Sequence, residues 1–242
     1  MKRHLNTCYR LVWNHITGAF VVASGLARAR GKRGGVAVAL SLAAVTSLPV
    51  LAADIVVHPG ETVNGGTLAN HDNQIVFGTT NGMTISTGLE YGPDNEANTG
   101  GQWVQDGGTA NKTTVTSGGL QRVNPGGSVS DTVISAGGGQ SLQGRAVNTT
   151  LNGGYQYVHN GGTASDTVVN SDGWQIVKNG GVAGNTTVNQ KGRLQVDAGG
   201  TATNVTLKQD GALVTSTAAT VTGINRLGAF SVVEGKADNV VL

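Results

Sequence analysis

The sequence predicts an all-β fold, namely a right-handed parallel β-helix with three short strands in each coil of about 19 residues, preceded by a cleaved signal peptide. The first observation is a pattern that returns every 17 to 20 residues from about residue 100 onward. Aligned copies occupy residues 100–117, 118–135, 153–170, 172–189 and 191–208. The second is a composition with 39 glycines and 4% aromatic residues, in which small apolar residues recur at fixed places. Such a fixed period is typical of a solenoid, whose coils bury their apolar sides against one another.

Each repeat holds three pieces that favour short strands. In the copy at 153–170 they are an apolar step at 157–158, a Thr-Ala step at 163–164 and a threonine-rich piece at 166–169. A glycine pair at 161–162 separates the first two pieces and supplies the positive φ that a sharp corner demands. Three strands and three corners make one coil, and parallel crossovers of this kind are right-handed. Val, Ile and Leu stacked on like residues then form the core.

Residues 1–52 are interpreted as an extended signal peptide. Seven of the 16 Lys and Arg residues lie within the first 33 positions, ahead of an apolar run at 36–45 that Pro49 ends. Small residues allow cleavage after Ala52, with Ala53 as the nearby alternative. A membrane anchor is the weaker interpretation, because the run is shorter than the roughly 20 residues of a spanning helix. We therefore expect an exported chain with no membrane span in its mature segment.

Charge and cysteine content exclude several functional classes. The first acidic residue is Asp54, so the mature segment carries all 14 acidic residues against nine basic ones. A basic, nucleic-acid-binding protein is excluded, because the basic balance belongs to the signal. The single cysteine, Cys8, also lies in the signal, which leaves the mature segment without disulfides or thiol metal sites.

The mature segment divides into two parts. Residues 53–99 are expected to form N-terminal capping rungs with an inserted loop at 88–99, and residues 100–242 the β-helix repeats. Asp94 and Glu96 in the loop are two candidate calcium ligands, but a solvated turn is the better interpretation, because calcium needs six to eight oxygens. The coil at 136–152 is short. At the C-terminus we expect rung-like strands that end on a bare apolar face.

The candidate site is a polar stripe along one edge of the rod, just before and within the threonine-rich strands. Stacked side chains there would form many weak hydrogen bonds in register, which is an adhesive surface. The alternative is corner chemistry, since Asn, Asp and Thr cap turns through their own side chains. The predicted self-association edge is Asn111, Thr113, Asp131, Thr132, Asn148, Thr149, Asp166, Thr167, Asn185 and Thr186, with Asn204 continuing it.

Other sites are weaker. Catalysis by a β-helix needs several carboxylates on neighbouring coils, and here Asp131 and Asp166 lie two coils apart. The mature histidines show no metal-ligand spacing, so we predict no catalytic residue, metal or cofactor. Four aromatic residues are interpreted first as packing plugs at repeat ends and second as sugar-stacking groups: Trp103, Tyr155, Tyr157 and Trp174. Glycosylation sequons begin at Asn111, Asn148, Asn185 and Asn204, where repetition is the simpler cause.

These residues resemble a known family. The segments Tyr9–Asn14, 21–24 and 27–28 resemble the extended signal region of large Gram-negative autotransporters, with Gly25 where that pattern has an acidic residue. The repeats resemble the passenger domain of the self-associating autotransporter adhesins over essentially the whole chain. The resemblance implies a β-helix displayed at the cell surface or outer membrane, and association between passengers of neighbouring cells that produces autoaggregation and biofilm.

The predicted function is that of a cell-surface adhesin passenger fragment that associates with identical or related passengers, and with host or matrix glycans as further candidate partners. The family's autochaperone stretch and membrane barrel are missing from the sequence, so we expect a truncated chain that ends in the periplasm or is secreted. Two alternatives stay open. One is a polysaccharide-binding or polysaccharide-cleaving β-helix, and the other is a non-functional remnant.

Overall fold

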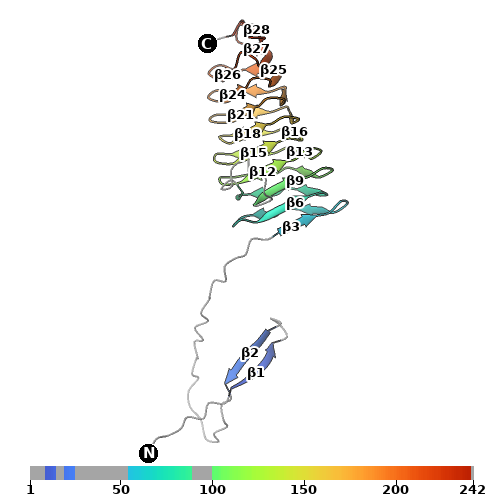
Figure 1. Ribbon diagram of the computed structural model, residues 1–242. Coiled ribbons are helices and arrows are strands. Elements are labelled where there is room, and N and C mark those ends of the chain that lie inside the picture. Colours follow the sequence, from blue (N-terminus) through green and yellow to red (C-terminus); the bar gives the residue numbers. More distant parts are fainter. Residues whose placement is uncertain (1–8, 15–18, 25–53, 89–99, 241–242) are drawn as a thin grey trace, which may run out of the picture. The chain divides into compact units, whose positions relative to one another are not determined.

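A computed structural model describes residues 9–14, 19–24, 54–88 and 100–240, and every regular element among them is a β-strand. The chain divides into two compact units, Met1–Ser47 and Leu48–Leu242. In the first unit, β1 (Tyr9–Asn14) pairs antiparallel with β2 (Ala19–Ser24). In the second unit, the strands stack rung upon rung into a parallel solenoid, as Figure 1 shows. The described residues include no helix that is long and apolar enough to span a bilayer.

One side of the solenoid is a nine-stranded parallel sheet, to which each rung contributes a four-residue strand. Its strands are β3 (Asp54–Val57), β6 (Asn73–Val76), β9 (Gly101–Val104), β12 (Leu120–Val123), β15 (Gly139–Leu142), β18 (Tyr155–Val158), β21 (Trp174–Val177), β24 (Arg193–Val196) and β26 (Ala212–Thr215).

The remaining strands of the second unit form an 18-stranded sheet. Within it, the second strands of successive rungs stack in one parallel row and the third strands in another. The second strand of each rung lies in β4 (Thr62–Asn64), β7 (Thr79–Asn81), β10 (Thr109–Asn111), β13 (Ser128–Ser130), β16 (Arg145–Val147), β19 (Thr163–Ser165) and β22 (Val182–Gly184). The third lies in β5 (Thr67–Leu68), β8 (Thr84–Ile85), β11 (Thr114–Val115), β14 (Val133–Ser135), β17 (Thr150–Asn152), β20 (Val168–Val169) and β23 (Thr187–Val188). Strand β25 (Thr201–Leu207) passes through both rows. The prediction of three short strands per coil is confirmed.

The short coil at 136–152 keeps its register. Strand β15 pairs in parallel with β12 before it and β18 after it. The coil is shorter than the others because its corners have fewer residues. Between Leu142 and Arg145 the chain turns through two residues, where the preceding rung uses four. A solenoid tolerates such a deletion, because corners lie outside the stacked core.

Three columns of inward side chains make the core. In all but the end rungs, the last residue of the first strand, the middle residue of the second strand and an apolar residue of the third strand are buried. In the rung that begins with β18 these residues are Val158, Ala164 and Val169, all of which are fully buried. Alternation along each strand places these residues inside and their neighbours outside. The middle residue of the second strand is alanine in most rungs, and this small side chain allows the second strand to pack close to the other two.

A column of buried glutamines runs beside these apolar columns and was not predicted. Each glutamine is the second residue of its strand, and from Gln102 onward each donates its Nε2–H to the Oε1 of the glutamine one rung earlier, over 2.7–2.8 Å. All six are fully buried: Gln74, Gln102, Gln121, Gln140, Gln156 and Gln175. We call this column the glutamine ladder. It satisfies amide groups that would otherwise be costly inside a protein, and it fixes the register of successive rungs.

The C-terminal end differs from the prediction. Strand β27 (Thr220–Asn225) pairs antiparallel with β28 (Gly228–Val233), and β28 pairs antiparallel with β29 (Lys236–Asp238). Residues 230–233, expected as a rung strand, therefore run against the rung direction, and Phe230 and Val232 are buried. The expected bare face is partly wrong, because the chain folds back over the last rung. The expected strand at 239–242 is not found at 239–240, and 241–242 lie outside the described residues.

Candidate adhesive edge

In six successive rungs, from that of β10 to that of β25, the corner between the second and third strand carries one non-glycine residue in the left-handed conformation. These residues have φ between 54° and 57°: Lys112, Asp131, Asn148, Asp166, Asn185 and Asn204. Asn and Asp are the non-glycine residues that adopt this region most readily, which explains why they recur here. Their backbone N–H groups donate to the next rung, as from Asp166 to the Gly184 carbonyl at 3.0 Å. We call this column of corner residues the polar edge.

Side chains along the polar edge hydrogen bond from rung to rung in two runs. In the first run, Asn148 Nδ2 donates to Asp131 Oδ1 at 3.2 Å, and Ser130 Oγ links Asp131 to Asn111. In the second run, Asn185 Nδ2 donates to Asp166 Oδ1 at 3.1 Å, and Asn204 Nδ2 donates to Asn185 Oδ1 at 3.2 Å. Neighbouring amides therefore orient the carboxylates, while both groups stay exposed to solvent.

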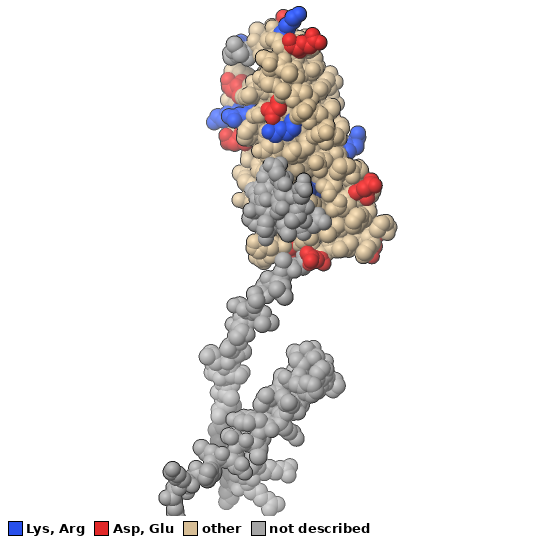
Figure 2. Space-filling model, in the orientation of Figure 1, with Lys and Arg blue, Asp and Glu red and all other residues tan. Residues whose placement is uncertain are grey.

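The second run borders a shallow groove of about 450 Å³. Its lining consists of three corner residues and the outward residues of the adjoining strands: Asp166, Val168, Asn185, Thr187, Asn204 and Thr206. This pattern of hydrogen-bonding groups and small apolar surface repeats once per rung. Figure 2 shows that charged side chains are scattered over a mostly uncharged surface on the face in view.

The predicted threonine members of the edge lie inside the solenoid. Thr113, Thr132, Thr149, Thr167 and Thr186 are at most 1% exposed. Each follows a corner residue, and alternation along the strand turns its side chain into the core. Some of them support the glutamine ladder, as where Thr186 Oγ1 donates to Gln175 Oε1 at 2.9 Å. Their placement on the surface was wrong, and the residues one position later face outward instead.

Asn111 also differs from its prediction. It pairs with Ser130 in the strand ladder, so the corner residue of its rung is Lys112. The Asn111 side chain still joins the first run, because its Nδ2 donates to Asn81 Oδ1 at 3.0 Å. The structure thus brings Asn111, Asp131 and Asn148 together, and separately Asp166, Asn185 and Asn204.

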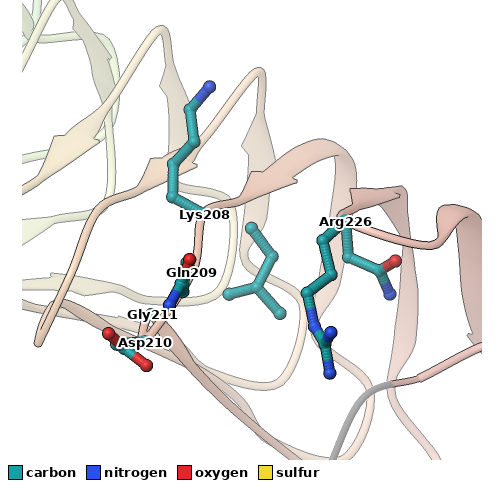
Figure 3. A pocket seen from close by; sticks show the side chains of 7 residues that line it. Lys208, Gln209, Asp210, Gly211 and Arg226 are labelled. Carbon is teal, nitrogen blue, oxygen red and sulfur yellow. The ribbon is translucent and has the colours of Figure 1, made fainter.

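A hollow near the C-terminal end of the solenoid is a second candidate site, and it is lined by exposed charged side chains. The hollow, of about 530 Å³, lies between the turn 208–211 and the turn that holds Arg226, and Figure 3 shows the side chains that line it. Its charged side chains, Lys208, Asp210 and Arg226, are all exposed, and in the figure the two cations extend in different directions. Within the described ranges no cluster of His, Cys, Asp and Glu could hold a metal ion. Asp94 and Glu96 lie outside those ranges.

The four aromatic residues lie on the outward face of the nine-stranded sheet rather than at repeat ends. Trp103 is enclosed, whereas Tyr155, Tyr157 and Trp174 are half-buried. Each is the first or third residue of its strand, and these positions alternate with the buried glutamine and valine columns.

Tyr155 is expected to ionise late in alkaline solution. The pKa of Tyr155 is raised from 10.0 to about 12, chiefly by burial and also by the neighbouring Tyr157, while the charge of Arg122 partly opposes the shift. Because the pKa of Tyr155 is higher in the folded than in the unfolded state, its neutral side chain contributes to the stability of the fold. This contribution is present below about pH 10 and is lost as the pH rises through about 12. Absorbance titration of the protein and of Tyr155→Phe should show a phenolate transition near pH 12 only in the former. A difference spectrum that titrates near pH 10 would contradict it.

Comparisons with known proteins add two family matches. Residues 6–53 match the extended signal peptide of the type V secretion system. Residues 141–192 match the adhesin of the bacterial autotransporter system, described as a probable stalk. The chain carries the features of an autotransporter adhesin passenger. The signal match indicates export by type V secretion, while the cleavage positions Ala52 and Ala53 lie outside the described residues.

A solved structure shows the same resemblance. The crystal structure of a TibA fragment, hyper-glycosylated by TibC, superposes with a TM-score of 0.63 at 36% sequence identity. The match covers 69% of this chain and 59% of the TibA fragment. The chain thus spans about three fifths of the length of that relative, and the resemblance of its signal and repeats to autotransporter adhesins is confirmed.

Proposed function

We propose that this chain is the passenger of a cell-surface adhesin and associates with copies of itself through the polar edge. The observation that carries the proposal is the rung-to-rung hydrogen bonding of exposed Asn and Asp side chains in two runs. An ordered row of donors and acceptors loses little side-chain entropy on binding, so weak contacts repeated at each rung add up. On the face that Figure 2 shows, most of the surface is uncharged, which limits electrostatic repulsion between copies there.

The proposed role is binding rather than catalysis. Acidic side chains on the polar edge are isolated, since Asp131 and Asp166 have the amide residue Asn148 between them. Two rungs of about 4.8 Å place the Asp131 and Asp166 corners roughly 10 Å apart, at the far limit of the about 5–9.5 Å between the paired carboxyl groups of glycosidases. Asn and Asp side chains bonded to each other fit recognition of a similar edge, where each amide can pair with a carboxylate or amide of the partner.

Four of the six side chains of the polar edge can be removed without straining the backbone. Asp131, Asn148, Asp166 and Asn185 all have a positive φ that glycine adopts freely, so the fourfold glycine variant removes the side chains and keeps the corner. In cells that display the protein, we expect this variant to abolish clumping in a settling assay. The physical reason is the loss of the repeated side-chain hydrogen bonds that the contact would use.

A matched control lies at a different corner. Asp172, Lys191 and Asp210 are also exposed and have φ between 58° and 61°. The triple glycine variant at these positions makes the same kind of backbone change, and its cells should clump like the wild type. Undiminished clumping of the polar-edge variant at equal surface display would refute the proposal, and so would equal loss in both variants.

A further inference from the structure

A second surface of the solenoid, on the nine-stranded sheet, combines aromatic rings with a polar rim. Its outward residues come from three successive rungs, at the first and third positions of β18, β21 and β24. In this grid Tyr155, Trp174 and Arg193 form one column, and Tyr157, Ile176 and Gln195 form the next. We call these six residues the aromatic face. It lies on a different sheet from the strands that flank the polar edge.

The rings of the aromatic face are held in defined positions. Tyr155 and Tyr157 meet edge to face, with ring centroids 5.3 Å apart. The Tyr155 ring lies over Gly139 of the preceding rung, where a Cβ would come within 2.5 Å of it, so the missing side chain makes room for the ring. Tyr157 stacks on His159 with centroids 5.9 Å apart. Rings that are fixed before binding offer contact area at a low entropy cost.

The aromatic face is partly open, unlike the rungs below it. Trp103 and Arg122 hold outward positions on the same sheet, yet both are only 4% exposed, with the guanidinium 4.3 Å from the indole centroid. By contrast Tyr155, Tyr157 and Trp174 are half-buried and Arg193 is exposed. Burial of Ile176 between them gives the face a closed apolar floor.

Polar groups border the rings on one side. Lys178 Nζ pairs with Asp197 Oδ2 at 3.0 Å, and Gln195 Nε2 donates to Asp197 Oδ1 at 2.7 Å. Burial alone would raise the pKa of Asp197, but the hydrogen bonds from Gln195 and Lys178 and the lysine charge outweigh it, so the pKa is lowered. The carboxylate is therefore ionised near neutral pH. Lys178 also stands 5.5 Å from the Tyr157 ring centroid, and the Arg193 guanidinium 5.2 Å from that of Trp174.

We propose that the aromatic face binds a neutral, pyranose-containing glycan. A sugar ring presents C–H groups that pack on aromatic rings, and hydroxyls that need both donors and acceptors at the edge of the contact. Asp197 supplies the acceptor, Lys178 and Gln195 supply donors, and the tyrosines supply ring surface. The Lys178–Asp197 pair neutralises its own charge, and Arg193, the remaining charge of the face, lies over the Trp174 ring, so the face lacks the row of cations that would favour an acidic polymer over an uncharged ligand. This site is independent of the polar edge.

The test is fluorescence titration of the purified protein with three named probes. Two are neutral, cellohexaose and mannohexaose, and the third is the acidic hexamer of galacturonic acid. The Trp103→Phe variant leaves Trp174 as the reporter beyond the signal segment, and its emission should change on addition of a neutral hexamer. In that background, Tyr157→Ala should weaken binding by at least about tenfold, because ring contact is lost. Asp197→Asn should weaken it less.

Controls separate this proposal from the one on self-association. Asn185→Gly on the polar edge should bind the neutral hexamer like the wild type, and Tyr157→Ala should leave cell clumping intact. Circular dichroism confirms folding of each variant, and Tyr157→Phe, which keeps the ring, should retain binding. The proposal is overturned if neither neutral hexamer binds, if Tyr157→Ala binds as tightly as its parent, or if the acidic hexamer binds more tightly than both neutral ones.

Discussion

Replacement of Gln121 by leucine is expected to lower the free energy of unfolding by about 2–4 kcal/mol. Gln121 donates to Gln102 Oε1 at 2.8 Å and accepts from Gln140 Nε2 at 2.7 Å, in the middle of the glutamine ladder. Leucine has a similar volume, so the cost comes from the two neighbouring amides that lose these partners inside the core. Chemical denaturation followed by circular dichroism measures the change.

Gln74→Leu is the matched control for the ladder. Gln74 is equally buried, but it stands at the N-terminal end of the column and its Nε2 makes no hydrogen bond within the described structure. The amide that it accepts from, Gln102 Nε2, also donates to Thr80 at 3.2 Å. We expect a loss below about 1 kcal/mol. Equal losses in the two variants would show that the ladder hydrogen bonds do not determine the stability of the core.

The second large effect is expected at a glycine where two rungs touch. A Cβ on Gly162 would lie 2.3 Å from the carbonyl oxygen of Leu142 in the preceding rung, and 3.0 Å from that of His159. Both obstacles are backbone atoms, so Gly162→Ala must separate the rungs at this corner. We expect a loss of about 3 kcal/mol in unfolding free energy. Thermal and chemical denaturation provide the measurement.

The neighbouring glycine provides the comparison. Gly161 has φ of 81°, and a Cβ there would meet nothing closer than the Gln143 carbonyl oxygen at 3.8 Å. Asparagine tolerates this backbone region, so Gly161→Asn should cost about 1 kcal/mol or less. If Gly162→Ala is the milder of the two, close rung contact is not what requires glycine at the second position of the pair.

The sequence repeat was sufficient to predict the solenoid and its three strands per rung. A period of about 19 residues with paired glycines allows few other folds, and the strands β18, β19 and β20 overlap the pieces predicted at 157–158, 163–164 and 166–169. The C-terminal end was harder to predict, because Phe230–Val233 is as apolar as a rung strand. Only its pairing shows that the chain reverses there.

The candidate site was half predicted. Asn and Asp at the corners were identified by type, but the neighbouring threonines were assigned to the surface, because polar character was given more weight than strand alternation. Thr167 follows the exposed corner residue Asp166, and successive residues of an extended chain point to opposite sides. The Thr167 side chain is therefore buried in the core. The buried glutamine ladder, by contrast, could have been predicted from the sequence. Every glutamine of the ladder stands two residues before a buried apolar residue, as Gln156 does before Val158. That spacing assigns both to the inward face.

Sedimentation velocity of the purified protein, at increasing concentration, would show whether it associates with itself through the polar edge. We expect the wild type and the Asp172, Lys191 and Asp210 triple glycine variant to form larger species as concentration rises. The fourfold glycine variant of the polar edge should sediment as a folded monomer throughout. Concentration-dependent growth of that variant equal to the wild type would contradict self-association through the polar edge.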